Sequence, residues 1–169
     1  MTLATAPNDT DTIVVGMAEM HVRRYPCGPL ACLGLGSCIA LCAYDPTSKV
    51  GGVVHIVLPN SENKRDVAPT KYADTAVPAL INEMIKHGGS RSRIIAKLVG
   101  GAQLSLAPGL DNMFKTGERN TRETEIALNK EKIPIVDADT GGNRGRTIHF
   151  HLETGEVLIK IAGSEKKRI

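Results

Sequence analysis

A cysteine and a histidine on two strand-like segments are the residues of this sequence best suited to covalent chemistry. Cys38 follows the glycine-rich run "GLGS", and His55 lies seventeen residues further along, within "VGGVVHIVLP". A thiol paired with an imidazole gains thiolate character, and the thiolate is the nucleophilic form of cysteine. The flexible backbone at Gly36 could bring the N–H groups of Ser37 and Cys38 to a developing oxyanion. These residue types favour an acyl-transfer site.

Pairing of the two segments would bring the thiol and the imidazole together. The stretches "SCIALCAYD" and "VGGVVHIVLP" are rich in strand formers, and the linker "DPTS" between them suits a type I turn. If Asp45 faces Ser48, then Cys38 lies directly opposite His55, with Cβ atoms about 4.5 to 5.5 Å apart. A one-residue shift would put the two side chains on opposite faces. The alternative of a buried thiol and a strand histidine without a task stays open.

The bulk composition narrows the classes of function. The chain has 169 residues, with no Trp, two Phe and three Tyr, so its core must be largely aliphatic. Its 21 basic and 18 acidic residues form no basic stripe with interleaved aromatics, which argues against a nucleic-acid partner. Neither a secretory signal nor a long apolar run is visible, so we expect a cytoplasmic protein without membrane insertion.

The four cysteines, Cys27, Cys32, Cys38 and Cys42, are expected to be free thiols in a reducing compartment. Zinc needs ligands at about 2.3 Å each. On one strand, however, the Cα atoms of Cys38 and Cys42 stand about 13 Å apart, too far to share an ion.

No other motif indicates a cofactor. His149 and His151 share a strand face, but a third metal ligand is not evident, so a packing role is favoured. The pair Gly34 and Gly36 lacks the third glycine of a dinucleotide fingerprint. We therefore expect neither a metal nor an organic cofactor.

Two segments have helical signals. Between Pro69 and Gly88, apolar residues follow the spacing of a one-sided helix: Ala73, Ala76, Val77, Leu80, Ile81 and Met84. Pro78 lies inside this pattern, so we expect either a kink there or a helix that starts close by. A more polar helix is predicted over residues 120–132, with Asn120 or Thr121 as its N-cap.

Strands outnumber these helices and do not alternate with them. We predict a strand at 12–18 after a disordered leader (1–11), strands in "RIIAKLVGGA" and "IPIVDADTGG", a hairpin turning at 153–156, and a solvated basic tail (164–169). This order predicts an α+β fold in one domain, 1–169: a layered sandwich of mixed β-sheets with helices packed on one side.

The motifs "LGLGSCIALCAYDP", "KVGGVVHIVLP", "KYAD", "VGGA" and "DTGGNRGR", in this order, closely resemble the CheD family of chemoreceptor glutamine deamidases. The resemblance covers the chain from about Ile13 to Gly163. It implies that Cys38 is the nucleophile and His55 the general base and acid. The implied substrate is glutamine in the cytoplasmic helices of chemoreceptors, which becomes glutamate with release of ammonia and without a cofactor.

The resemblance also implies a third residue, a Thr six positions before the nucleophile that orients the imidazole. This sequence has Cys32 there, and a thiol is a weaker hydrogen-bond partner. Three alternatives follow: Cys32 orients His55 poorly, a backbone carbonyl takes over, or activity is reduced and binding matters more. Since family members bind the CheC phosphatase, a non-catalytic adaptor for receptors or CheC is the main rival, and a cysteine amidase or transglutaminase-like enzyme is a third possibility.

Overall fold

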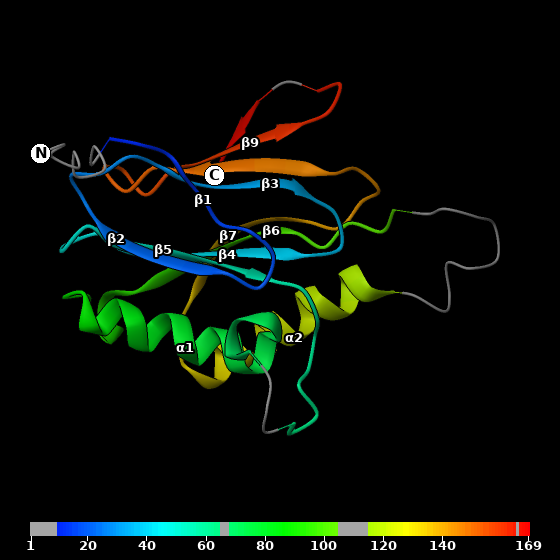
Figure 1. Cartoon of the computed structure of the whole chain (residues 1–169), viewed down its shortest axis with the longest axis horizontal. Helices are drawn as coiled ribbons and strands as arrows, with labels where there is room; N and C mark the ends of the chain where they lie inside the picture. The colour runs from blue at the N-terminus through cyan, green and yellow to red at the C-terminus, as the bar shows by residue number, and fades with distance from the viewer. Residues whose placement is uncertain (1–9, 65–67, 105–114, 165) are drawn as a thin grey trace, which may run out of the picture.

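Two five-stranded β-sheets stack face to face, and two helices cover the outer face of one of them (Figure 1). The computed structural model describes residues 10–64, 68–104, 115–164 and 166–169. The first sheet, here called the open sheet, has the order β1 (Ile13–Val14), β3 (Leu30–Leu35), β8 (Arg146–Phe150), β9 (Val157–Ile161) and β10 (Lys167–Arg168). The second, here called the covered sheet, has the order β2 (Met20–Arg24), β5 (Val50–Ile56), β4 (Ile39–Asp45), β6 (Ile95–Gly100) and β7 (Ile135–Thr140).

Both sheets are mixed. β1 runs parallel to β3 and β6 runs parallel to β7, whereas the other neighbouring strands are antiparallel. The predicted α+β sandwich of mixed sheets with helices on one side is therefore confirmed.

Helix α1 (Ala73–Lys86) packs on β5 and against α2 (Thr116–Lys130). Two short 3-10 turns, η1 (Pro69–Lys71) and η2 (Arg91–Arg93), flank α1. The buried side of α1 consists of the six predicted apolar residues, and Pro78 lies within the helix rather than near its start. Neither helix in the described part of the chain is long and apolar enough to span a membrane.

The start of α2 differs from the prediction. The helix begins at Thr116, so Asn120 is not its N-cap but a fully buried residue of the second turn. The first turn of α2 carries no apolar side chain in the sequence pattern, because it packs against the backbone after β6 and not against core side chains. A Cβ at Gly117 would come within 2.5 Å of the Gly101 carbonyl oxygen.

The central hairpin of β4 and β5 is buried on both faces. Side chains of β4 alternate between two cores: Ile39 and Leu41 face the helices, whereas Ala40 and Cys42 face the open sheet. A residue that pairs with β4 therefore points into the same core as the β4 residue opposite it.

The hairpin register corrects the prediction by two residues. Asp45 pairs with Val50 rather than Ser48, and Ala40, not Cys38, lies directly opposite His55. The loop spans 46–49, because Lys49 takes a left-handed conformation (φ 52°) and the partner strand begins only after it. A shift of two residues is one full period of side-chain alternation, so Cys38 and His55 remain on the same face.

Two strands and the C-terminal pairing were not predicted. β2 and β3 were missed because β2 carries exposed His and Arg side chains at a sheet edge and β3 carries a glycine near its end. The first strand covers only Ile13–Val14. The terminal segment has exposed side chains, but it forms the edge strand β10 instead of a free tail. Residues 1–9 of the expected leader lie outside the described residues.

Asp45 fastens the turn that sets the hairpin register. Its fully buried side chain accepts hydrogen bonds from the N–H groups of Thr47, Ser48 and Ser90 and from the guanidinium of Arg93. Burial by itself would raise the pKa of Asp45, but these hydrogen bonds outweigh it and hold the pKa well below its usual range. Because Arg93 is 41 % exposed, solvent screening weakens its ion pair with Asp45.

We expect Asp45→Ala to lower the free energy of unfolding at pH 7 by about 2 kcal/mol, because three part-buried N–H groups and the Arg93 guanidinium lose a fully buried acceptor. Asp137→Ala on the exposed strand β7 serves as the control and should stay within about 0.5 kcal/mol. Since folding lowers the pKa of Asp45, its contribution is present above the unfolded pKa of about 3.9 and is lost as pH falls below it. Urea unfolding at pH 7 and pH 3 measures both effects, and equal losses at the two pH values would contradict this account.

Candidate active site

β3 ends, β4 begins and β5 ends at one end of the sandwich (Figure 1, right). Cys38 comes directly before β4, and His55 is the last residue but one of β5. The side chain of Cys38 packs against the core between the two sheets. His55 pairs with Ala40, which belongs to the same core, so the imidazole shares that face. Diagonal neighbours across antiparallel strands stand about 7 to 8 Å apart, within reach of long and aromatic side chains.

The imidazole is held by a backbone carbonyl. Nδ1 of His55 lies 3.1 Å from the carbonyl oxygen of Val15, the residue that follows β1. A carbonyl oxygen can only accept, so Nδ1 carries the proton and Nε2 keeps the free lone pair. The main chain of His55 is fixed as well. Its N–H donates to the backbone carbonyl of Glu19, and its carbonyl accepts from the backbone N–H of Ala18, each at 3.0 Å.

Burial prepares His55 to act as a base. The side chain is only 5 % exposed, and this burial lowers the pKa of the imidazole below its usual value. The Val15 carbonyl and the negative charge of Glu19 oppose the shift without reversing it. At neutral pH the ring is therefore uncharged and able to accept a proton.

The thiol of Cys38 is half-buried, and burial raises its pKa above the usual value. A neutral thiol next to a neutral imidazole is consequently the resting state. If this thiol reacts as a nucleophile, general-base activation fits these protonation states better than a preformed thiolate does.

Cys32 does not hold the imidazole. It lies on β3 opposite Ile148, fully buried in the core between the sheets. This burial, together with the charge of Cys38, raises the pKa of Cys32 to about 12. The bond from His55 Nδ1 to Val15 agrees with the second of the three alternatives, in which a backbone carbonyl takes over. A main-chain oxygen leaves no mark in the sequence, so Val15 could not be found from residue types.

The turn before Cys38 is hydrogen-bonded to the segment that follows β6. Ala102 N–H donates to the Gly36 carbonyl and Gly101 N–H to the Cys38 carbonyl, both at 2.9 Å. Within the described residues, the N–H groups of Ser37 and Cys38 have no hydrogen-bond acceptor. These two half-buried residues therefore present, beside the thiol, two donors that no described residue accepts.

The "VGGA" motif has a steric role at this turn. Gly100 has a φ of +118°, and a Cβ there would lie 2.2 Å from the Cys38 carbonyl oxygen. Only glycine allows the end of β6 to approach the backbone of Cys38 so closely. A double glycine after a buried strand was the sequence signal for this contact.

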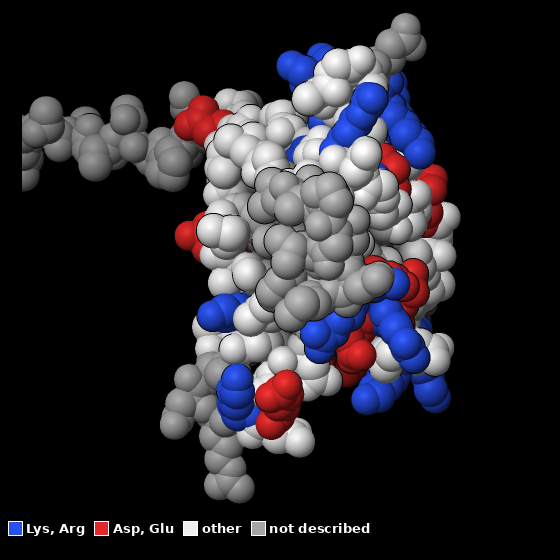
Figure 2. Space-filling view, turned by 90° about the vertical axis from the view of Figure 1, so that its right-hand side faces the viewer, with Lys and Arg blue, Asp and Glu red and all other residues white. Residues whose placement is uncertain are grey.

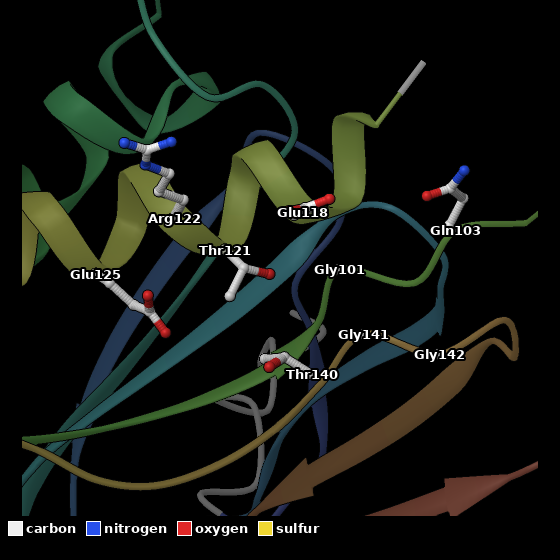
Figure 3. A pocket seen from close by; sticks show the side chains of 9 residues that line it. All are labelled: Gly101, Gln103, Glu118, Thr121, Arg122, Glu125, Thr140, Gly141 and Gly142. Atoms are coloured by element: carbon white, nitrogen blue, oxygen red, sulfur yellow. The ribbon is translucent and has the colours of Figure 1, made fainter. Parts of the chain in front are cut away.

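Two pockets adjoin the turn. One of about 210 Å³ lies beside Ser37, where the chain after β6 meets the start of α2. The other, of about 500 Å³, lies between α2 and the segments after β6 and β7 (Figure 3). Its lining comprises Gly101, Gln103, Glu118, Thr121, Arg122, Glu125, Thr140, Gly141 and Gly142. Neither Cys38 nor His55 lines it, so this pocket is a neighbour of the site and not its centre.

The same end of the molecule carries charges of both signs. Figure 2 shows lysine and arginine side chains interspersed with acidic ones around the visible part of this face. Among the described residues, no three His, Cys, Asp or Glu side chains gather where they could hold a metal ion, and Cys32, Cys38 and Cys42 are free thiols.

The structure is thus an α+β sandwich with a cysteine and a histidine at one end, and comparison with known proteins gives its family. The family model described as "CheD chemotactic sensory transduction" matches residues 57–161. A probable chemoreceptor glutamine deamidase CheD from Caldanaerobacter subterraneus is 46% identical over 92% of this chain and 96% of its own length. The chemoreceptor glutamine deamidase CheD from Thermotoga maritima is 41% identical over 92% and 96% of the two chains. A probable CheD from Desulfitobacterium hafniense is 41% identical over 95% and 99%. The chain belongs to the CheD family.

Because burial raises the pKa of Cys38, we expect its alkylation by iodoacetamide to increase with pH, with a midpoint above about 8.5. Peptide mass spectrometry separates Cys38 from Cys27, which is also partly exposed. Buried Cys32 and Cys42 should stay unlabelled in the folded protein. A midpoint near 4 would instead reveal a resting thiolate and imidazolium pair.

Proposed function

We propose that this chain is a chemoreceptor glutamine deamidase that uses Cys38 as nucleophile and His55 as general base and acid. The observation that carries the proposal is the placement of both side chains on one face at the end of the β4–β5 hairpin, with Nδ1 of His55 tied to the Val15 carbonyl. This bond leaves Nε2 available for proton transfer. The names of the CheD relatives support the same activity.

In the first half of the reaction, the sulfur of Cys38 attacks the side-chain carbonyl carbon of glutamine. The S–C bond forms as the thiol proton moves to Nε2 of His55, and the carbonyl oxygen becomes an oxyanion. The N–H groups of Ser37 and Cys38, for which the described part of the chain offers no acceptor, stabilise that charge. The C–N bond then breaks, and the imidazolium returns its proton to the departing ammonia.

In the second half, water hydrolyses the thioester. His55 takes a proton from the attacking water, the same N–H groups hold the second oxyanion, and the S–C bond breaks. Glutamate leaves, and the thiol and the neutral imidazole are restored. The lowered pKa of His55 suits this cycle because the ring must be unprotonated before each attack.

The proposed substrate is the glutamine-bearing helices of the cytoplasmic part of chemoreceptors, and the proposed location is the cytoplasm. A CheC-type phosphatase is a proposed partner that would compete for the same end of the sandwich. We also propose that the chain works as one deamidase domain, since both cores share the β4–β5 hairpin.

We expect the protein to convert particular glutamines of a receptor cytoplasmic fragment to glutamate, with a gain of about one dalton each because NH₂ is replaced by OH. Intact-mass measurement of the fragment and an assay for free ammonia record the reaction. Cys38→Ala should abolish conversion while the variant still binds the fragment.

Two outcomes would contradict the proposal. Binding without conversion by the wild-type protein would point to the rival adaptor function. Release of ammonia with incorporation of an added amine would indicate a transglutaminase-like reaction instead.

We expect Cys32→Thr to change kcat less than about threefold, because the Val15 carbonyl already fixes the orientation of His55. Thr is close to Cys in size but brings a hydroxyl into a fully buried apolar core, so the melting temperature of Cys32→Thr is measured beside its kinetics. Steady-state kinetics of the two proteins give the comparison. A rise in kcat of tenfold or more for Cys32→Thr would show that a hydroxyl at this position orients the ring better than the carbonyl does.

A further inference from the structure

A buried asparagine on α2 reaches the two chain segments that carry the candidate catalytic residues. Asn120 is fully buried in the second turn of the helix. Its Nδ2 donates to the carbonyl oxygen of Ser37 and to that of Val57, both at 2.9 Å. Ser37 directly precedes Cys38, and Val57 follows His55 by two residues.

These two carbonyls lie where the β4–β5 ladder ends. The last pair of the ladder on this side joins Ile39 to Ile56, so the next rung would join Cys38 to Val57. One amide group of Asn120 bridges the two segments at this point. Its two hydrogen bonds therefore connect the chain before Cys38 to the chain after His55, where the β-ladder provides no further backbone pair.

The bond to Ser37 has a consequence for Cys38 through the geometry of the peptide unit. The carbonyl of Ser37 and the N–H of Cys38 belong to the same planar trans peptide, so they point in opposite directions. A carbonyl held toward α2 turns the Cys38 N–H away from the helix. Accepting a hydrogen bond at the oxygen also polarises the peptide and strengthens its N–H as a donor.

The preceding peptide is held in the same way. The Gly36 carbonyl accepts from Ala102 N–H, which turns the Ser37 N–H to the opposite side. The carbonyls of two successive peptides are thus occupied, and within the described chain the two N–H groups of Ser37 and Cys38 stay without acceptors.

We propose that Asn120 is a positioning residue that aims the N–H of Cys38 at the developing oxyanion. This inference rests on the proposed function. It assigns Asn120 a role in transition-state stabilisation, distinct from the placement of the sulfur or of the imidazole.

The remaining polar atom of Asn120 argues against a role in stability alone. Its Oδ1 is buried, and no partner for it exists in the described part of the protein. A buried acceptor without a partner destabilises a fold, so the side chain is poorly suited to serve as a simple filler. Its two donated hydrogen bonds, one to the segment before Cys38 and one to the segment after His55, account for its presence.

The test compares Asn120→Ala with Thr124→Ala in the full-length protein. Thr124 is also fully buried on α2, one turn further along, but its hydroxyl donates only to the Asn120 carbonyl within the helix. It therefore controls for the loss of a buried polar group from α2. Asn120→Asp is a second variant of nearly equal volume that leaves no cavity and replaces the two N–H donors with a carboxyl group, which can donate at most one hydrogen bond.

Asn120→Ala should lower kcat for deamidation about tenfold or more, with KM within about twofold, because the loss appears only in the transition state. Thr124→Ala should lower the melting temperature but leave kcat within about twofold. Alkylation of Cys38 by iodoacetamide, which develops no oxyanion, should stay within about threefold in both variants.

A second readout does not depend on the receptor substrate. Butanal labelled with ¹³C at its carbonyl adds the Cys38 thiol to give a tetrahedral adduct whose oxygen occupies the oxyanion position. NMR titration should show about fivefold or more weaker binding to Asn120→Ala and Asn120→Asp than to wild type or Thr124→Ala. If the wild-type protein forms this adduct but deamidates no receptor fragment, the proposed function is wrong. Weaker adduct formation by the Asn120 variants would still support the role of Asn120 in positioning the Cys38 N–H.

The inference is overturned if Asn120→Ala and Thr124→Ala lose kcat to the same extent. It is also overturned if alkylation falls in parallel with adduct formation. Either result would mean that Asn120 only maintains the fold of the turn.

Discussion

The pairing of β4 with β5 is the constraint on which the site depends. An antiparallel ladder places side chains on alternating faces, so two residues near its end share an environment only if the register has the right parity. In this register, the side chains of Cys38 and His55 point into the core between the sheets, and those of Ile39 and Ile56 point toward the helices. At the opposite end of the hairpin, Asp45 accepts hydrogen bonds from the turn and so stabilises the conformation that sets this register.

Burial then gives the two groups their chemical state. The same desolvation that raises the pKa of Cys38 lowers that of His55, so both favour the uncharged form. Such a pair needs a well-oriented ring more than a nearby counter-charge. The Val15 carbonyl provides this orientation from outside the hairpin, which links the open sheet to the candidate base.

The sequence predicted the parts of this structure that periodicity can reveal. The apolar spacing of α1, the central hairpin and the C-terminal hairpin of β8 and β9 were confirmed, because each has a strong local pattern. The hairpin register was wrong by two residues, since the left-handed conformation of Lys49 has no signal in its residue type. β2 escaped prediction because a sheet edge needs no apolar alternation.

The environment of the site was harder to predict than its two central residues. Types and spacing pointed to Cys38 and His55, but the group on Nδ1 is a main-chain oxygen that any residue at position 15 would supply. Asn120 was expected as an N-cap because asparagine favours that position. Its burial follows from the extra helical turn that begins at Thr116, where glycine rather than an apolar residue makes the contact.

The double burial of β4 has a consequence for how sequence change affects this protein. Neighbouring positions on the strand belong to different compartments, so a volume change at Leu41 disturbs the contact with the helices, whereas one at Ala40 disturbs the wall behind the imidazole. Enlarged side chains along β4 would thus strain the helix-side core and the core between the sheets in strict alternation, residue by residue.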